Sequence, residues 1–131
     1  MAKSGRLRFF VQSHQSRSPH FDFRLEHDGV LKSWAVPKGV PETAGIRRLA
    51  VVTPDHELSF GDFEGEIPES EPGGGVITIW DRGTYQPLRW EEDHLEFTLS
   101  GTRLSGRYHM VQFYRGGDRE WLIFKTDKPS Q

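Results

Sequence analysis

The sequence contains no cysteine, which excludes disulfide bonds, thiolate-bound metals and cysteine nucleophiles. It also lacks any apolar run close to the ~20 residues that a membrane-spanning helix needs. The residues after Met1 are polar and basic rather than apolar, so no secretory signal is expected. Together these absences predict a cytoplasmic protein that does not enter a membrane.

A surplus of positive charge is missing as well. There are 17 Lys and Arg residues against 19 Asp and Glu residues, which gives a net charge of −2. Coating nucleic acid by bulk electrostatics requires a strong cationic surplus, so that class of function is excluded. A local basic pocket that grips one strand end is still allowed. The length of 131 residues predicts a single domain, residues 1–131, which we expect to be monomeric.

No segment shows a sustained 3.6-residue hydrophobic period, so we expect at most a short turn or two of helix. The dominant period is two residues, which is typical of strands, and 8 prolines with 14 glycines indicate many turns. Such a pattern predicts an antiparallel barrel or sandwich of short strands. The expected strands are residues 7–12, 20–25, 30–36, 47–53, 76–80, 85–90, 95–99, 103–113 and 120–124, and residues 64–75 are expected to form a mobile surface loop.

The most informative stretch is His20-x-Asp22-x-Arg24. On a strand, alternate residues face the same side, so these three side chains form a polar row with about 6.5–7 Å between neighbours. Imidazole and carboxylate together suit a divalent transition metal. A guanidinium does not ligate a metal, but it binds phosphate oxygens bidentately. His14 precedes the strand closely enough for a loop to fold it back as a third ligand.

Three further residues are candidates for the same site. Lys38 follows the third expected strand, Arg48 lies on the next one, and His56 comes just after it. Taken alone, each of them is best interpreted as an ordinary solvated side chain. A single histidine on a strand is likewise more often a structural residue than a metal ligand. If their strands are neighbours, however, they make one cationic pocket beside the metal.

The order of these motifs along the chain resembles a known family. The matching segments run in order through nearly the whole chain: Phe-Val-Gln-Ser-His14, His20-Phe-Asp-Phe-Arg24-Leu-Glu-His-Asp-Gly-Val-Leu-Lys-Ser-Trp34-Ala-Val-Pro-Lys38-Gly, Arg48-Leu-Ala-Val, Asp55-His56, Asp62-Phe-Glu-Gly, Ile67-Pro-Glu, Trp80-Asp-Arg-Gly-Thr and Trp121-Leu-Ile-Phe-Lys125. They resemble the 3′-phosphoesterase domain of bacterial DNA ligase D, a family that repairs double-strand breaks by end joining.

The resemblance implies a fold, a cofactor and an activity. It implies a compact antiparallel β-barrel of about eight strands with little helix. It also implies a manganese-dependent hydrolase, with other divalent transition metals as alternatives to Mn²⁺. The family removes a 3′-terminal ribonucleoside from DNA and then the exposed 3′-phosphate, which leaves a 3′-hydroxyl. Carried over by position, the implied metal ligands are His14, His20 and Asp22, and the implied phosphate-binding or catalytic residues are Arg24, Lys38, Arg48 and His56.

Several positions depart from the family pattern. Pro54 stands where a glutamate is common, Phe60 where a tyrosine is associated with activity, and Pro72 where the glycine-rich loop carries a tyrosine. These departures leave the expected metal ligands in place and bear on the rate and on which of the two steps is carried out. Because no polymerase or ligase segment accompanies the motifs, we expect end joining to require a separate ligase, polymerase and end-binding proteins.

Two alternatives from other classes follow from the same residues. An iron-dependent oxygenase with two histidines and one carboxylate would pair His20 and Asp22 with His56, His94 or His109. The Arg and Lys residues near the motif count against it, because they favour a phosphate substrate. The other alternative is a non-catalytic module that keeps the fold and binds DNA ends without turnover.

Overall fold

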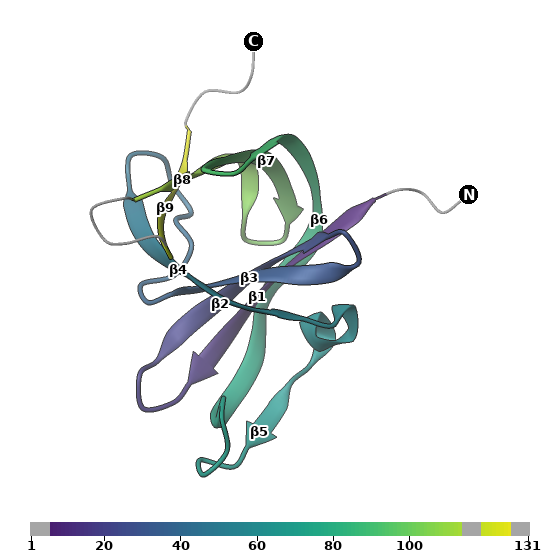
Figure 1. Cartoon of the computed structure of the whole chain (residues 1–131), viewed down its shortest axis with the longest axis vertical. Helices are drawn as coiled ribbons and strands as arrows, with labels where there is room; N and C mark the ends of the chain where they lie inside the picture. Colours follow the sequence, from purple (N-terminus) through teal and green to yellow (C-terminus); the bar gives the residue numbers. More distant parts are fainter. Residues whose placement is uncertain (1–5, 114–118, 127–131) are drawn as a thin grey trace.

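The computed structural model describes residues 6–113 and 119–126, in which nine strands form one continuous sheet (Figure 1). Their hydrogen-bonded order is β1-β2-β3-β4-β9-β8-β7-β6-β5, and an additional pairing of β1 with β6 closes eight of them into an antiparallel barrel. The expectation of an eight-stranded antiparallel barrel is therefore confirmed. The strands are β1 (Leu7–Gln15), β2 (His20–His27), β3 (Val30–Val36), β4 (Arg47–His56), β5 (Gly65–Ile67), β6 (Gly75–Glu91), β7 (His94–Gly101), β8 (Ser105–Gln112) and β9 (Glu120–Lys125).

The β2–β3 hairpin turns at Asp28-Gly29, as the sequence predicts. Both residues have positive φ, 54° for Asp28 and 83° for Gly29. Two central residues with positive φ make the turn type whose twist matches that of the flanking strands. This turn fixes the register of the hairpin, in which Asp22 lies opposite Ala35 and Arg24 opposite Ser33.

Strand β6 is the element that closes the barrel, and here the sequence prediction is wrong. Residues 76–80 and 85–90 were expected as two strands, but they belong to one strand of 17 residues. Its first part pairs with β1, and from Gly83 onward it pairs with β7. Gly83 lies where the pairing with β7 begins, against the backbone of Ser100, and a Cβ atom at this position would collide with the Ser100 carbonyl oxygen. Glycine lets one strand serve two partners without interruption.

The barrel interior is filled by one face of each strand. On β1 and β2 the inward residues are Phe9, Val11, Phe23 and Leu25, all fully buried. They belong to a larger apolar cluster that includes Trp34, Val36, Val40, Ala50, Tyr85, Leu95, Phe97, Leu99, Leu104, Tyr108, Met110, Trp121 and Ile123. The opposite face of β1 and β2 is polar apart from Phe10, and it carries the residues of interest.

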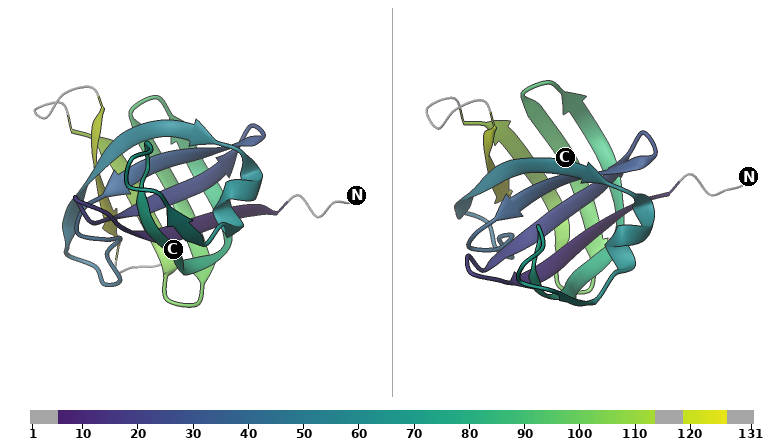
Figure 2. Two further views of the ribbon diagram at one scale, coloured as in Figure 1. Left: turned by 90° about the horizontal axis from the view of Figure 1, so that it is seen from below. Right: turned by 60° about the horizontal axis from the view of Figure 1, so that its bottom comes forward.

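That polar face is covered by a second, smaller layer. The 3-10 helix η1 (Leu58–Asp62) packs on β1, where Gly61 lies directly over the ring of Phe10. Strand β5 extends the sheet beyond β6, so part of the expected loop 64–75 is a strand. Figure 2 shows this segment from two further sides, and Figure 1 places it away from β7 and β8. Among the described residues, no helix has the length and apolar character needed to cross a membrane.

The buried carboxylate of Asp81 provides a test of the fold. It accepts hydrogen bonds from the backbone N–H groups of Thr102, Arg103 and Leu104, at 2.9, 3.1 and 2.8 Å. Asp81→Ala leaves these donors without a partner, so we expect the free energy of unfolding to fall by about 2–4 kcal/mol. Chemical denaturation measures this loss. Asp55→Ala, which removes only an exposed ion pair with Lys32, is the control and should cost under about 1 kcal/mol. An equal loss in both variants would contradict the role of Asp81.

Candidate metal and phosphate site

The β1–β2 hairpin brings the three candidate ligands together. His14 was expected in a loop, but β1 continues through Gln15 and pairs His14 directly with His20. The next outward pair in the ladder is Gln12 opposite Asp22. Because paired residues share a face, His14, His20 and Asp22 all point away from the barrel interior. The third ligand thus comes from strand pairing and not from a folded-back loop.

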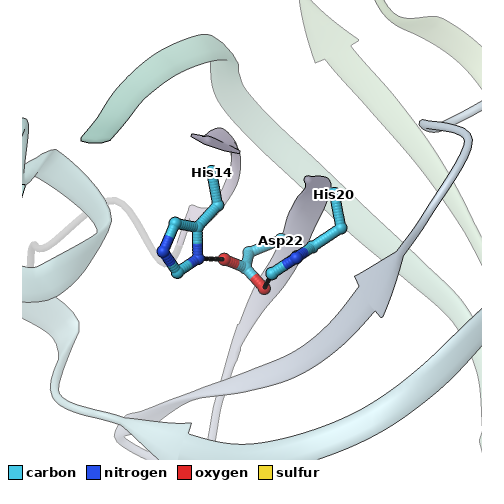
Figure 3. A group of neighbouring side chains, drawn as sticks. All are labelled: His14, His20 and Asp22. Atoms are coloured by element: carbon cyan, nitrogen blue, oxygen red, sulfur yellow. Dashed lines mark hydrogen bonds and ion pairs between the residues drawn. The ribbon is translucent and has the colours of Figure 1, made fainter. Parts of the chain in front are cut away.

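The two imidazoles flank the carboxylate (Figure 3). His20 Nε2 lies 3.1 Å from Asp22 Oδ1, and His14 Nδ1 lies 3.5 Å from Asp22 Oδ2. One ligand atom from each residue lies within 4.8 Å of the other two. Two imidazole nitrogens and one carboxylate oxygen at this spacing form a donor set suited to a divalent transition metal.

The other ring nitrogen of each histidine contacts a backbone carbonyl. His14 Nε2 lies 3.0 Å from the Gly74 carbonyl oxygen, and His20 Nδ1 lies 2.8 Å from that of Ser18. A carbonyl only accepts, so each of these nitrogens carries the proton. The nitrogens that face Asp22 therefore carry lone pairs when the rings are neutral. Metal-binding histidines are typically oriented by such second contacts.

The pair formed by His20 and Asp22 shifts both pKa values. The hydrogen bond to Asp22 raises the pKa of His20 above 6.5, although burial opposes the shift. Burial would raise the pKa of Asp22, but the hydrogen bond from His20 and the charge of Arg24 outweigh it, so this pKa lies below its ordinary value. Asp22 is only 6% exposed. An ionised, buried carboxylate is the form that binds a cation.

Arg24 continues the polar row and is held on three sides. Its Nε donates to Gln12 Oε1 at 2.6 Å and its Nη1 to Ser33 Oγ at 2.7 Å, while Nη2 lies 3.6 Å from Asp22 Oδ2. Its guanidinium also lies 5.0 Å from the centre of the Phe60 ring. At 3% exposure, this cation is fixed before any substrate arrives.

Gln12 is a residue that sequence reasoning missed. Its side chain is fully buried, and its amide nitrogen donates to the carbonyl oxygens of Phe60 and Phe63 at 2.8 and 3.1 Å. Its oxygen accepts from Arg24, so one amide connects the guanidinium to the end of η1. The only signal in the sequence is a polar residue that directly follows the apolar run of residues 9–11 within the first expected strand.

His56 reaches the same cavity because β4 contains a bulge. Thr53 pairs with Ser33 and His56 pairs with Leu31, so β4 has one residue more than β3 between these pairs. Residues three apart on a regular strand face opposite sides, and the extra residue brings both Thr53 and His56 to one side. Pro54 lies within the bulge, where a residue without an N–H is tolerated.

The cavity formed in this way has a volume of about 310 Å³. That size is within the range of small-molecule and cofactor sites. The Thr53 hydroxyl oxygen is buried and has no hydrogen-bond partner among the described residues. Thr53 is therefore a second residue that sequence reasoning missed. The cavity is lined by His14, His20, Asp22, Arg24, Thr53, His56, Phe60, Ile67, Pro72, Gly73 and Ile77.

An aromatic stack forms one side of the cavity. His56 stacks on Phe60 at 4.5 Å between ring centres, and Phe60 stacks on Phe63 at 5.3 Å. Burial lowers the pKa of His56, and the charge of Arg24 lowers it further. In the free protein His56 is therefore neutral at pH 7 and has one N–H to donate.

Lys38 and Arg48 lie together, but they line a different hollow. Arg48 Nη1 donates to the carbonyl oxygens of Lys38 and Gly39 at 2.7 and 3.0 Å. Their hollow is also lined by Phe21, which alternates with His20 and Asp22 and so faces the other side of β2. Neither cation lines the cavity of Arg24 and His56. Their assignment to the scissile phosphate stays a prediction.

The alternative oxygenase ligand sets are not assembled. Within the described residues, the third side chain grouped with His20 and Asp22 is His14. His56 lines the cavity without joining the group, and His94 and His109 belong to a separate cluster on β7 and β8.

Known proteins resemble this chain over most of its length. Residues 12–112 match the family described as the DNA ligase D 3′-phosphoesterase domain. The chain is 46% identical over 129 residues to the multifunctional non-homologous end joining protein LigD of Pseudomonas aeruginosa, covering 94% of this chain and 15% of that protein. It is 47% identical over 121 residues to the multifunctional non-homologous end joining DNA repair protein LigD of Mycobacterium tuberculosis, covering 89% of this chain and 16% of that protein. The chain thus spans about one sixth of the length of these relatives.

The His20–Asp22 pair predicts a titration that nuclear magnetic resonance can follow in the metal-free protein. His20 should titrate above 6.5, and Asp22→Asn should move its pKa below that value, because burial and Arg24 then act without an opposing charge. A raised folded-state pKa stabilises the fold at pH below 6.5, and this contribution is lost as the pH rises through the folded-state value. Asp55→Asn is the control and should leave the His20 curve unchanged. An unaltered curve in Asp22→Asn would rule out the pairing.

Proposed function

The chain belongs to the DNA ligase D 3′-phosphoesterase domain family, and from this we propose that it is a metal-dependent phosphoesterase of nucleic-acid 3′ ends. The observation that carries the proposal is the arrangement of His14 and His20 around Asp22. Both rings are fixed by backbone carbonyls with their second nitrogens toward one buried carboxylate. A preorganised site of this kind is costly to maintain and is typical of function.

The donor set fits a divalent transition metal, and we propose manganese as the ion. His14 Nδ1, His20 Nε2 and the Asp22 carboxylate would hold it, which leaves open positions for substrate and water. When bound, such an ion acts as a Lewis acid on a phosphate oxygen and lowers the pKa of a bound water.

Arg24, His56 and Thr53 would bind the phosphate. The Nε of Arg24 donates to Gln12 and its Nη1 donates to Ser33, whereas its Nη2 makes only a longer contact of 3.6 Å with Asp22 Oδ2, so Nη2 is the group that would bind a phosphate oxygen. Being fixed beforehand, this cation offsets developing negative charge without reorganising during the reaction. As the neutral ring, His56 would donate a hydrogen bond to the phosphate; to protonate the leaving oxygen it would first have to take up a proton and act as the imidazolium.

The proposed substrates are DNA ends that carry a terminal ribonucleoside or a 3′-phosphate, with a 3′-hydroxyl as product. The family description supports the phosphoesterase activity, and the names of the relatives connect it to non-homologous end joining. Because the chain spans only about one sixth of those relatives, we propose that ligase, polymerase and end-binding activities come from other polypeptide segments. From the family resemblance, Lys38 and Arg48 are proposed to bind phosphate of the same strand.

The central test is conversion of 3′ ends by the purified chain with manganese. A labelled primer–template ending in one ribonucleotide and another ending in a 3′-phosphate should yield 3′-hydroxyl products, and chelation should stop the reaction. His20→Ala should lower turnover by about 10³-fold or more, since metal catalysis contributes several kcal/mol. His27→Ala, at the other end of the same strand, is the matched control and should retain activity. Binding without conversion by folded, metal-loaded protein would identify an end-binding module instead.

The unpartnered hydroxyl of Thr53 allows a finer test. Thr53→Val keeps the shape of the side chain and removes a group that has no partner among the described residues, so stability should not fall. If this hydroxyl binds substrate, kcat/KM should drop roughly tenfold, which corresponds to about 1.4 kcal/mol. Thr53→Ser retains the hydroxyl and should stay close to the parent. Equal kcat/KM values in the valine and serine variants would show that the hydroxyl does not contact substrate.

A further inference from the structure

A second group of metal-ligating side chains lies on the outer wall of the barrel, at β7 and β8. It consists of His94, Glu96 and His109, and one ligand atom from each lies within 4.8 Å of the other two. Glu96 pairs directly with His109, and His94 precedes Glu96 by two residues, so all three share a face. Their neighbours Leu95 and Met110 point into the core, which places the cluster on the outside.

The two imidazoles are spaced as ligands of one ion would be. His94 Nε2 lies 3.2 Å from His109 Nδ1. A tetrahedral ion with bonds of about 2.0–2.1 Å to nitrogen holds two such atoms about 3.3 Å apart. The His109 ring is stacked on Phe124, at 5.3 Å between centres and 11° between planes, so its orientation is fixed. Little movement is needed to admit a metal between the two rings.

We propose that His94, Glu96 and His109 form a second metal site, for a divalent ion that prefers imidazole, such as Zn²⁺ or Co²⁺. Two imidazoles and one carboxylate supply three ligands, and water would fill the fourth position of a tetrahedral ion. The proposal is independent of the phosphoesterase activity, because it shares no residue with the cavity of His14, His20 and Asp22. In Figure 1, β7 and β8 lie on the far side of the molecule from β5.

Arg107 orients the carboxylate of this cluster. Its Nε and Nη2 groups both contact Glu96 Oε2, and His109 Nε2 lies 4.0 Å from the same oxygen. Carboxylates that bind metals are commonly held by a hydrogen bond from a neighbouring residue. Arg107 would therefore stay in place as the second contact of Glu96, while Oε1 faces the ion.

Arg89 weakens metal binding at this cluster, because it contacts one of the ligands in the metal-free protein. Its Nη1 donates to His94 Nδ1 at 3.2 Å, so in the metal-free protein the His94 proton is on Nε2, the nitrogen that faces His109. Metal binding requires that proton to move to Nδ1, and Arg89 must leave. The Arg89 side chain is 47% exposed and can turn into solvent. At His14 and His20 the backbone carbonyls already hold a proton on the nitrogen that faces away from Asp22, so metal binding there requires no change of tautomer and no displaced arginine, and the β7–β8 site should be the weaker of the two.

Metal stoichiometry tests the proposal. Protein of residues 1–131 is first freed of metal with a chelator and is then titrated with Co²⁺, followed by absorption, and with Zn²⁺ in a calorimeter. The parent should bind two equivalents, Asp22→Ala one, His94→Ala one, and the double variant none. In Asp22→Ala protein, saturating Zn²⁺ should also raise the melting temperature, and His94→Ala should abolish that rise. His27→Ala is the control histidine and should still bind two equivalents.

The outcomes separate this site from the phosphoesterase site. One equivalent that is lost with Asp22→Ala and kept with His94→Ala would overturn the β7–β8 site and leave the other standing. One equivalent that is lost with His94→Ala and kept with Asp22→Ala would support the β7–β8 site and overturn the metal site of His14, His20 and Asp22. If His27→Ala lowered the stoichiometry as much as His94→Ala, the binding would be non-specific and the proposal would fail. His109→Asn gives an independent variant if His94→Ala does not fold.

Discussion

The buried carboxylate of Asp22 requires neighbouring groups that stabilise its charge, and much of the surrounding structure provides them. A charge that is only 6% exposed is tolerated in a protein when neighbouring groups replace the water it has lost. His14 and His20 flank its two oxygens and Arg24 lies beside it, and the β1–β2 register provides all three. Because the register is one continuous ladder with the core residues on its other face, a slip of one residue would dismantle core and site together.

A thin outer layer turns this row of charges into a cavity. The barrel wall alone would expose the row to solvent, and η1 together with the segment around β5 covers it. Gln12 connects the two layers, because its amide bonds both Arg24 and the carbonyls at the end of η1. The Gly74 carbonyl makes a second connection, through His14. The geometry of the ligands thus depends on chain segments that are distant in sequence.

Two histidines and one carboxylate occur together at two places on the barrel, and the neighbouring residues determine what each group can bind. Each cluster contains two histidines and a carboxylate, and in each of them one histidine and the acid lie two residues apart on one strand. In the cavity, backbone carbonyls leave the inward nitrogens ready to ligate, and an arginine is available for a phosphate. On the outer wall, Arg89 and Arg107 contact the cluster directly.

Alternation along a strand is local, so the sequence by itself determined that the chain forms an antiparallel barrel or sandwich and that His20, Asp22 and Arg24 share one face. The position of His14 just before the strand made it a candidate third ligand, and the resemblance to a family added the barrel as the expected fold and manganese as the expected metal. What only the tertiary structure decided depends on partners far away in the chain: the length of β1 and β6, the buried amide of Gln12, and the bulge that brings His56 to the cavity. Register and bulges are set by the pairing of two strands, and the residues of one strand do not encode them.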